Sequence, residues 1–154
     1  MELVTVKGEA SEAIAQAIAG MWEINLGLTV QVKALTWPEY EGLCTTGRFY
    51  TARAGWISDY PDPAAFLSIL SSGARENFSG YRNQEYDHWL QRAQESTEFR
   101  ERMEIFHALE KAALNDWPVI PVYFATKPYL VSGELLELRF SPQGYPLFNT
   151  ARWK

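Results

Sequence analysis

The stretch from residue 3 to residue 35 decides the fold, because it opens with LVTV at residues 3–6 and closes with LTVQVKAL at residues 28–35. Both runs have the length and the β-branched content of strands. Gly27 stands where a helix would end with a positive φ. The residues between the two runs carry apolar side chains at helical spacing, namely Ile14, Ala17, Ile18, Met21 and Trp22. The stretch therefore predicts a β-α-β unit.

The next elements follow from capping and turn chemistry. Thr36-Trp37-Pro38-Glu39 has the form of a capping box and predicts a short helix that runs to Gly47. A third strand is expected over Phe49–Trp56, and a short helix is expected from Asp62 or Pro63 to Leu70. The polar stretch Ser71–Asn83 predicts a loop.

Two antiparallel helices are expected in the second half of the chain. Asn83 caps the first, whose apolar stripe is Tyr86, Leu90 and Ala93, and Ser96 or Thr97 starts the second. The second helix has a stripe that predicts core packing, formed by Phe99, Met103, Phe106, Leu109 and Ala113. Pro118 ends it, and a buried strand is expected over Val119–Phe124, which its prolines place at a sheet edge or a chain crossing. The tail shows only short extended pieces, Tyr129–Val131 and Leu135–Phe140. The expected class is α/β, a mixed sheet flanked by helices with an extended carboxy-terminal tail.

Composition excludes several kinds of function. The formal net charge is -5 and no run of Lys or Arg occurs, so a nucleic-acid partner is not expected. Cys44 is the single cysteine, which rules out an intrachain disulfide and predicts a small packed side chain. His88 and His107 lie in different expected helices without ligand spacing, so neither a metal site nor a cofactor is expected. No segment has the length of a membrane span, and no export signal is recognised at the amino terminus.

The stretch ARAGWISDYPDP at residues 52–63 contains the candidate site. A short strand runs into an acidic turn that Pro61 and Pro63 stiffen, and Asp59 places a carboxylate just beyond the strand end. Extended backbone up to Trp56 has hydrogen-bonding groups that can pair with another extended chain. The combination is suited to the amino terminus of a peptide.

The order of these pieces resembles the carboxy-terminal part of family 5 solute-binding proteins, the oligopeptide-, dipeptide- and nickel-binding receptors of ABC importers. The resemblance runs over nearly the whole chain and rests on these motifs: Asn25-Leu26-Gly27-Leu28, Ala54-Gly55-Trp56 with Asp59 and Asp62-Pro63, Gly80-Tyr81 with Tyr86-Asp87, and Pro118-Val119-Ile120-Pro121-Val122-Tyr123. It implies part of a periplasmic-binding-protein type II lobe over residues 1–124. Residues 125–154 are then a tail that returns to the missing amino-terminal lobe.

The resemblance also implies roles for single residues. Asp59 matches the aspartate that binds the ligand ammonium group, and Arg53 matches a position that in some members meets a ligand carboxylate. Trp56 would form a wall of a side-chain pocket, and the strand through Gly55 would pair its backbone with the peptide. Tyr123 and Phe124 would lie where the chain crosses between lobes. The resemblance also implies a periplasmic or extracellular membrane-attached location, and an ABC importer as partner. Neither follows from the residues themselves.

Each candidate residue also has an ordinary structural interpretation. Asp59 can be a turn residue that bonds its own backbone, Trp56 a core residue, and Arg53 a solvent-facing strand residue. An enzyme would use Asp59 and Asp62 as an acid/base pair, but no phosphate loop, metal cluster or His-supported nucleophile accompanies them. A third hypothesis is a structural fragment that folds and binds nothing.

Two expectations follow for the isolated chain. It should bind peptide weakly or not at all, because one wall of a cleft cannot exclude water from Asp59. Open sheet edges and the tail Lys127–Lys154 should favour self-association into homo-oligomers.

Overall fold

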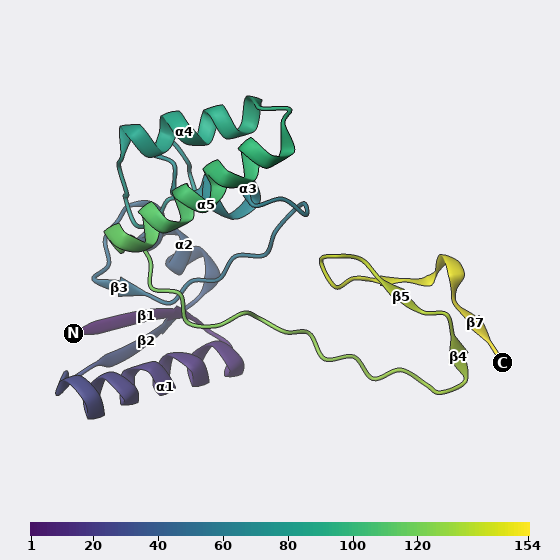
Figure 1. The fold of residues 1–154 in the computed structure, drawn as a ribbon. Helices are drawn as coiled ribbons and strands as arrows, with labels where there is room; N and C mark the ends of the chain where they lie inside the picture. Colours follow the sequence, from purple (N-terminus) through teal and green to yellow (C-terminus); the bar gives the residue numbers. More distant parts are fainter.

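A computed structural model describes all 154 residues and has a parallel three-stranded sheet at its base (Figure 1). The strands are β1 (Glu2–Val6), β2 (Gln31–Leu35) and β3 (Thr51–Ala52), in the order β2-β1-β3. β1 pairs with β2 over its whole length, from Glu2 opposite Gln31 to Val6 opposite Leu35. β3 pairs with β1 through only two residues.

Helices cover both faces of this sheet, which explains why β1 is apolar on both sides. Leu3 faces α1 (Glu9–Leu26) and packs with Ala15 and Ile18. Val4 faces the other way and packs with Tyr40 and Cys44 of α2 (Trp37–Thr45). The β-α-β prediction is confirmed, as is the packed position of the single cysteine.

Local capping chemistry fixes the end of α1 and the start of α2 as predicted, whereas α2 ends at Thr45, two residues before the expected Gly47. Gly27 ends α1 with φ of 66°. The capping box at the start of α2 is present, with the Thr36 N–H donating to the Glu39 carboxylate at 2.9 Å. β2 begins at Gln31 rather than Leu28, because the residues after Gly27 still complete the turn out of α1; the Leu28 N–H donates to the Trp22 carbonyl.

A helical layer lies on the other side of α2 and contains the larger hydrophobic core (Figure 1). It consists of α3 (Ala64–Leu67), the 3-10 turn η1 (Ser68–Leu70), α4 (Gln84–Glu95) and α5 (Phe99–Asp116). The Asn83 side chain accepts hydrogen bonds from two backbone N–H groups of α4, which confirms the predicted cap. Both predicted stripes meet in the core, with Tyr86, Leu90 and Ala93 from α4 and Phe106, Leu109 and Ala113 from α5.

One member of the second stripe was predicted wrongly. Phe99 is 73% exposed. The helix begins at Phe99 with Glu98 as its cap, rather than at Ser96 or Thr97, so Phe99 occupies the first helical position beyond the part of α5 that packs on α4.

An ion pair ties the loop before α3 to α5. Both guanidinium nitrogens Nη1 and Nη2 of Arg102 donate to the Asp62 carboxylate, at 2.6 and 2.8 Å, and both side chains are less than a quarter exposed. Asp62 also accepts the Ala64 N–H at the start of α3, and Arg102 donates through Nε to the Ala93 carbonyl. The hydrogen bonds from Arg102 hold the pKa of the Asp62 carboxyl below its ordinary value.

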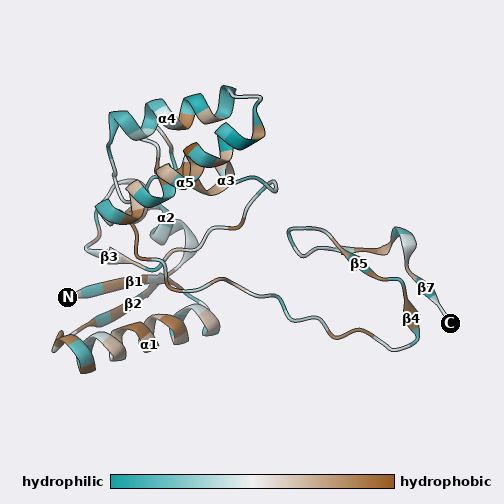
Figure 2. Ribbon diagram, viewed as in Figure 1, coloured by the Kyte–Doolittle hydropathy of each residue, from teal (hydrophilic) through white to brown (hydrophobic).

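The last part of the chain leaves the helical layer, and few of the strands predicted there from the sequence are present. Val119–Phe124 is not a strand: Pro118 and Pro121 lack donors, no strand of this chain lies beside it, and Phe124 is 98% exposed. Tyr129–Val131 is likewise not a strand. Figure 2 shows that apolar residues continue along this segment beyond α5. No helix has both the length and the apolar character needed to cross a bilayer.

The tail forms two small antiparallel pairs at a distance from the body (Figure 1). β4 (Leu135–Leu136) pairs with β7 (Arg152–Trp153), and β5 (Arg139–Phe140) pairs with β6 (Pro146–Leu147), which is followed by the 3-10 turn η2 (Phe148–Thr150). The expected extended pieces in Leu135–Phe140 are therefore present. The chain as a whole therefore contains both kinds of strand pairing. The main sheet is parallel throughout, and the two pairs in the tail are antiparallel.

We expect Asp62→Asn to lower the free energy of unfolding by about 1–3 kcal/mol, because Asn keeps the α3 cap but leaves Arg102 without its partner charge. Glu41→Gln is the matched control, since its pair with Arg75 is exposed, and a change below about 0.5 kcal/mol is expected. Urea unfolding measures both.

The same pair predicts a pH dependence. The folded-state pKa of Asp62 is depressed, so its contribution to stability is fully present above the unfolded-state pKa and is lost as the pH falls through the lower folded-state pKa. The difference in free energy of unfolding between the native chain and Asp62→Asn should therefore begin to shrink near about pH 4, the ordinary pKa of an aspartate, and should close only below the lower folded-state pKa. A constant difference down to pH 2 would contradict this assignment.

Candidate functional site

The site is built on the segment that follows β3. The Arg53 N–H still donates to the Val4 carbonyl at 2.8 Å, and then the chain leaves the sheet. Residues 54–57 make no backbone–backbone hydrogen bond, so the expected strand Phe49–Trp56 is reduced to Thr51–Ala52. The pairing stops at Ala52 although β1 continues to Val6, so the strand is short because the chain turns away from the sheet. The backbone groups of residues 54–57 are left free to pair with another extended chain.

Arg53 is directed to the amino-terminal end of α1 and to the segment Val119–Phe124 that follows α5, the crossing segment. Its Nη1 donates to the Ser11 hydroxyl at 3.2 Å, and its Nη2 donates to the Tyr123 hydroxyl at 3.1 Å. Neither partner is charged, and no carboxylate forms an ion pair with the guanidinium. The Tyr40 hydroxyl donates to the Arg53 carbonyl at 2.9 Å, which fixes the backbone at the exit from the sheet.

Trp56 and Gly55 lie at the surface of this segment. The Trp56 indole Nε1 donates to the Ala65 carbonyl of α3 at 2.9 Å, while 38% of the residue stays exposed. The ring is thus fixed in orientation but still offers a flat apolar surface. Gly55 has no positive φ, and a Cβ placed there would have no atom within 4 Å. The fold itself does not require glycine at this position.

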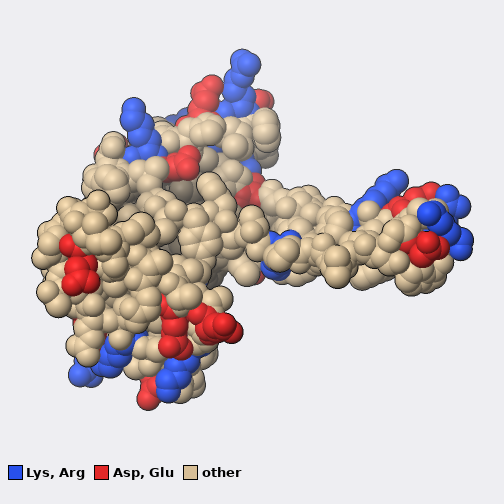
Figure 3. All heavy atoms as spheres, turned by 90° about the horizontal axis from the view of Figure 1, so that it is seen from below, with Lys and Arg blue, Asp and Glu red and all other residues tan.

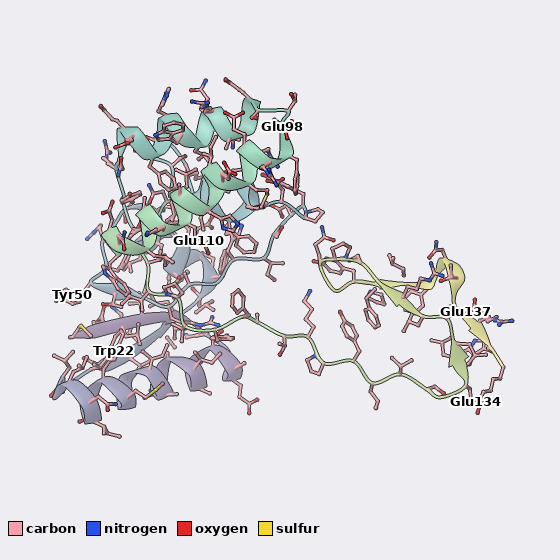
Figure 4. The ribbon with its side chains drawn as sticks, viewed as in Figure 1. Trp22, Tyr50, Glu98, Glu110, Glu134 and Glu137 are labelled. Carbon is pink, nitrogen blue, oxygen red and sulfur yellow. The ribbon has the colours of Figure 1, made fainter.

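Asp59 borders an open hollow of about 540 Å³ between the body and the tail. Ile57, Ser58 and Asp59 form one side, and four tail residues form the other: Ser141, Gln143, Tyr145 and Leu147. The hairpin of β5 and β6 points toward the loop before α3 (Figure 4). Asp59 is exposed, and its carboxylate makes no hydrogen bond or ion pair within the chain. The turn-residue interpretation, in which its oxygens bond nearby backbone, does not describe this geometry.

The two acidic side chains of the turn have different surroundings. Asp62 is committed to Arg102 and to the cap of α3, whereas Asp59 faces the hollow. A carboxylate that is held ionised by a bidentate guanidinium is a poor proton donor or acceptor near neutral pH. No group of three or more His, Cys, Asp and Glu side chains is arranged to hold a metal ion.

The tail side of the hollow was not predicted from the sequence, in which the last assigned site residue is Asp59. The stretch Ser141-Pro142-Gln143-Gly144 does carry a turn signal. Nothing in the sequence places that turn opposite Asp59, more than eighty positions earlier, because no periodic pattern connects the two segments.

The family profile of the middle part of bacterial extracellular solute-binding proteins, family 5, matches residues 1–78. The chain belongs to this family. The resemblance inferred from the motifs is therefore correct, and family members are solute-binding proteins rather than enzymes.

Known relatives agree with this family. The chain is 33% identical to the periplasmic murein peptide-binding protein MppA of Escherichia coli over 141 residues, 92% of this chain and 25% of that protein. The structure of that murein tripeptide binding protein superposes with a TM-score of 0.80 at 32% identity, over 88% of this chain and 26% of the other. OppA of Haemophilus influenzae, solved in complex with RPPGFSPFR, superposes with a TM-score of 0.79 at 26% identity, covering 87% and 26%.

These matches confirm the α/β class and the type II binding-protein lobe. The chain spans about a quarter of the length of the relatives it matches. MppA of Escherichia coli and OppA of Salmonella typhimurium are named as periplasmic peptide-binding proteins, and both are much longer than this chain.

Proposed function

We propose that this chain is the ligand-binding half of an ABC-importer receptor and that it captures peptides by their backbone and amino terminus. The observation that carries the proposal is the position of Asp59, an unpaired carboxylate on the rim of the hollow, just beyond the free backbone of residues 54–57. A charge-assisted hydrogen bond to an ammonium group is stronger than one between neutral groups. Related proteins are named as peptide-binding, which supports the same ligand class.

The free backbone of residues 54–57 provides affinity without reading side chains. An extended peptide that pairs with this segment continues the sheet beyond β3, which is a form of strand addition. Trp56 then supplies one wall for a ligand side chain, since its ring is fixed by the Ala65 carbonyl. Arg53 has no charged partner and is the cation for a ligand carboxylate at the other end of the segment.

We also propose that the two parts of the chain belong to different lobes of the receptor. Residues 1–124 form a partial carboxy-terminal lobe, and residues 125–154 meet the other lobe in the longer receptor. The importer's membrane subunits are partners of the whole receptor.

We expect Asp59→Asn to weaken binding of trialanine about tenfold, because Asn keeps the shape but loses the charge that attracts the ammonium group. N-acetylated trialanine should bind the native chain as weakly as trialanine binds the variant. Titrations followed by nuclear magnetic resonance suit the expected affinity, which is weaker than micromolar. Equal binding of trialanine to the native chain and Asp59→Asn would refute the role of Asp59.

We expect Gly55→Ala to leave stability within about 0.5 kcal/mol of the native value, because the added methyl group meets no atom of the chain. Binding of trialanine should fall severalfold, since the methyl group projects from the segment that a ligand backbone approaches. Gly73→Ala is the matched control: it also has open space and an ordinary φ, but it lies in the loop between η1 and α4. Unchanged affinity in Gly55→Ala would argue against strand addition at this edge.

We expect the isolated chain to self-associate, because the outer edges of β2 and β3 are unpaired and the crossing segment exposes Val122 and Phe124. Light scattering should show species larger than a monomer at high protein concentration, and Val122→Ser with Phe124→Ser should shift them toward monomer. Glu134→Gln, on a tail residue far from the crossing segment (Figure 4), is the control and should change nothing. A strict monomer at every concentration would overturn the expectation.

A further inference from the structure

The far side of the Asp59 hollow is an ordered turn rather than a loose end of chain. The Ser141 N–H donates to the Tyr145 carbonyl at 2.8 Å, and the Gly144 N–H donates to the Ser141 carbonyl at 2.8 Å. Gly144 has φ of 78°, which a three-residue hairpin loop needs at this point. The tip of the β5–β6 hairpin therefore presents residues 141–145 in one fixed arrangement.

Two contacts from the preceding segment brace this tip. The Tyr129 hydroxyl donates to the Gly144 carbonyl at 2.6 Å, and its ring packs on Phe140 with centroids 5.0 Å apart. The Lys127 ammonium lies 4.4 Å from the centre of the Tyr145 ring. Figure 3 shows the tail as an arm that projects from the body, with most of its charged side chains gathered at the far end. The hairpin thus has internal order independent of the body.

The side chains that the tip turns to the hollow complement Asp59 chemically. Gln143 is half-buried and makes no hydrogen bond within the chain, so its amide has a free donor and a free acceptor. Tyr145 and Leu147, with Ile57 across the hollow, supply apolar surface. The first residue of a peptide presents matching groups: a cation for Asp59, an amide group for Gln143 and a side chain for the apolar surface. A volume of about 540 Å³ lies within the usual range of small-ligand pockets.

We propose that the tip of the β5–β6 hairpin is the second wall of the peptide amino-terminal pocket. Gln143 hydrogen-bonds the first peptide group while Asp59 holds the ammonium group, and Tyr145 and Leu147 select an apolar first side chain. This inference rests on the proposed peptide-binding function and assigns a specificity role to the tail. It also places both walls of the pocket on this one chain.

The test follows the side-chain amide signals of an isotope-labelled full chain during titration with trialanine, at protein concentrations where scattering reports a monomer. The Gln143 signals should move, whereas those of Gln91 and Gln94, on the exposed face of α4, should not. Gln143→Ala should weaken trialanine binding about fivefold through the loss of one hydrogen bond, and Gln91→Ala should leave it unchanged. Leu147→Thr, which keeps strand propensity, should reduce the preference for Leu-Ala-Ala over Gly-Ala-Ala.

The outcomes separate this inference from the function on which it rests. If Asp59→Asn weakens binding while Gln143→Ala and Leu147→Thr have no effect, peptide capture by Asp59 stands and the hairpin wall is wrong. If the native chain does not bind trialanine at millimolar concentration, the pocket formed by Asp59 and the hairpin on this one chain is refuted, whereas capture through Asp59 in the longer receptor is not. Weakening in both Asp59→Asn and Gln143→Ala, with the amide signals of Gln143 moving, supports both.

Discussion

The two-residue pairing of β3 with β1 is the constraint on which the candidate site depends. β1 is buried on both faces, so its position is fixed by α1 on one side and α2 on the other. β3 takes its place from β1, and after Ala52 the chain turns away from the sheet with unpaired backbone, although β1 continues to Val6. A longer β3 with a neighbour on its outer edge would satisfy those groups internally and would leave nothing for a peptide to pair with.

Two contacts then hold the loop that carries Asp59. Trp56 is bonded to α3 at one end, and Asp62 is clamped by Arg102 at the other. Between them Asp59 has no partner, although a carboxylate in a turn commonly bonds the backbone around it. Binding sites commonly hold a charged group between rigid supports, because the group is then positioned while its hydrogen-bonding capacity stays available to a ligand.

Local signals in the sequence were sufficient for most of the fold. The glycine after α1, the capping box of α2 and the Asn83 cap depend on residues within a few positions of one another, and each is present. The β-α-β unit is also present, because each of its three elements has its own periodic pattern in one continuous stretch. The errors concern segments whose structure depends on distant neighbours. Val119–Phe124 has strand composition but no strand to pair with, and Phe99 has a helical-stripe spacing but lies beyond the partner helix.

The candidate site likewise has a part that local sequence indicates and a part that depends on distant segments. The sequence and the family resemblance indicated Asp59, Trp56, Arg53 and Gly55, all within one continuous stretch, and their proposed roles stay predictions. The tail side of the hollow could not be predicted, because it depends on how two segments far apart in the chain lie relative to each other. The hydrogen-bond partners of Arg53, Ser11 and Tyr123, could not be predicted either, because the alternation of side chains along a strand does not indicate contacts with distant residues.

The segment between α5 and β4 has a further consequence for how long a ligand would stay bound. It has no regular secondary structure, and most of its side chains face solvent, so the hairpin is joined to the body mainly through the chain itself. In the proposed binding mode, each capture event would carry an entropic cost for bringing the two walls to a fixed separation. Any brace on this segment, whether a neighbouring lobe or an engineered cross-link, would act mainly by slowing dissociation.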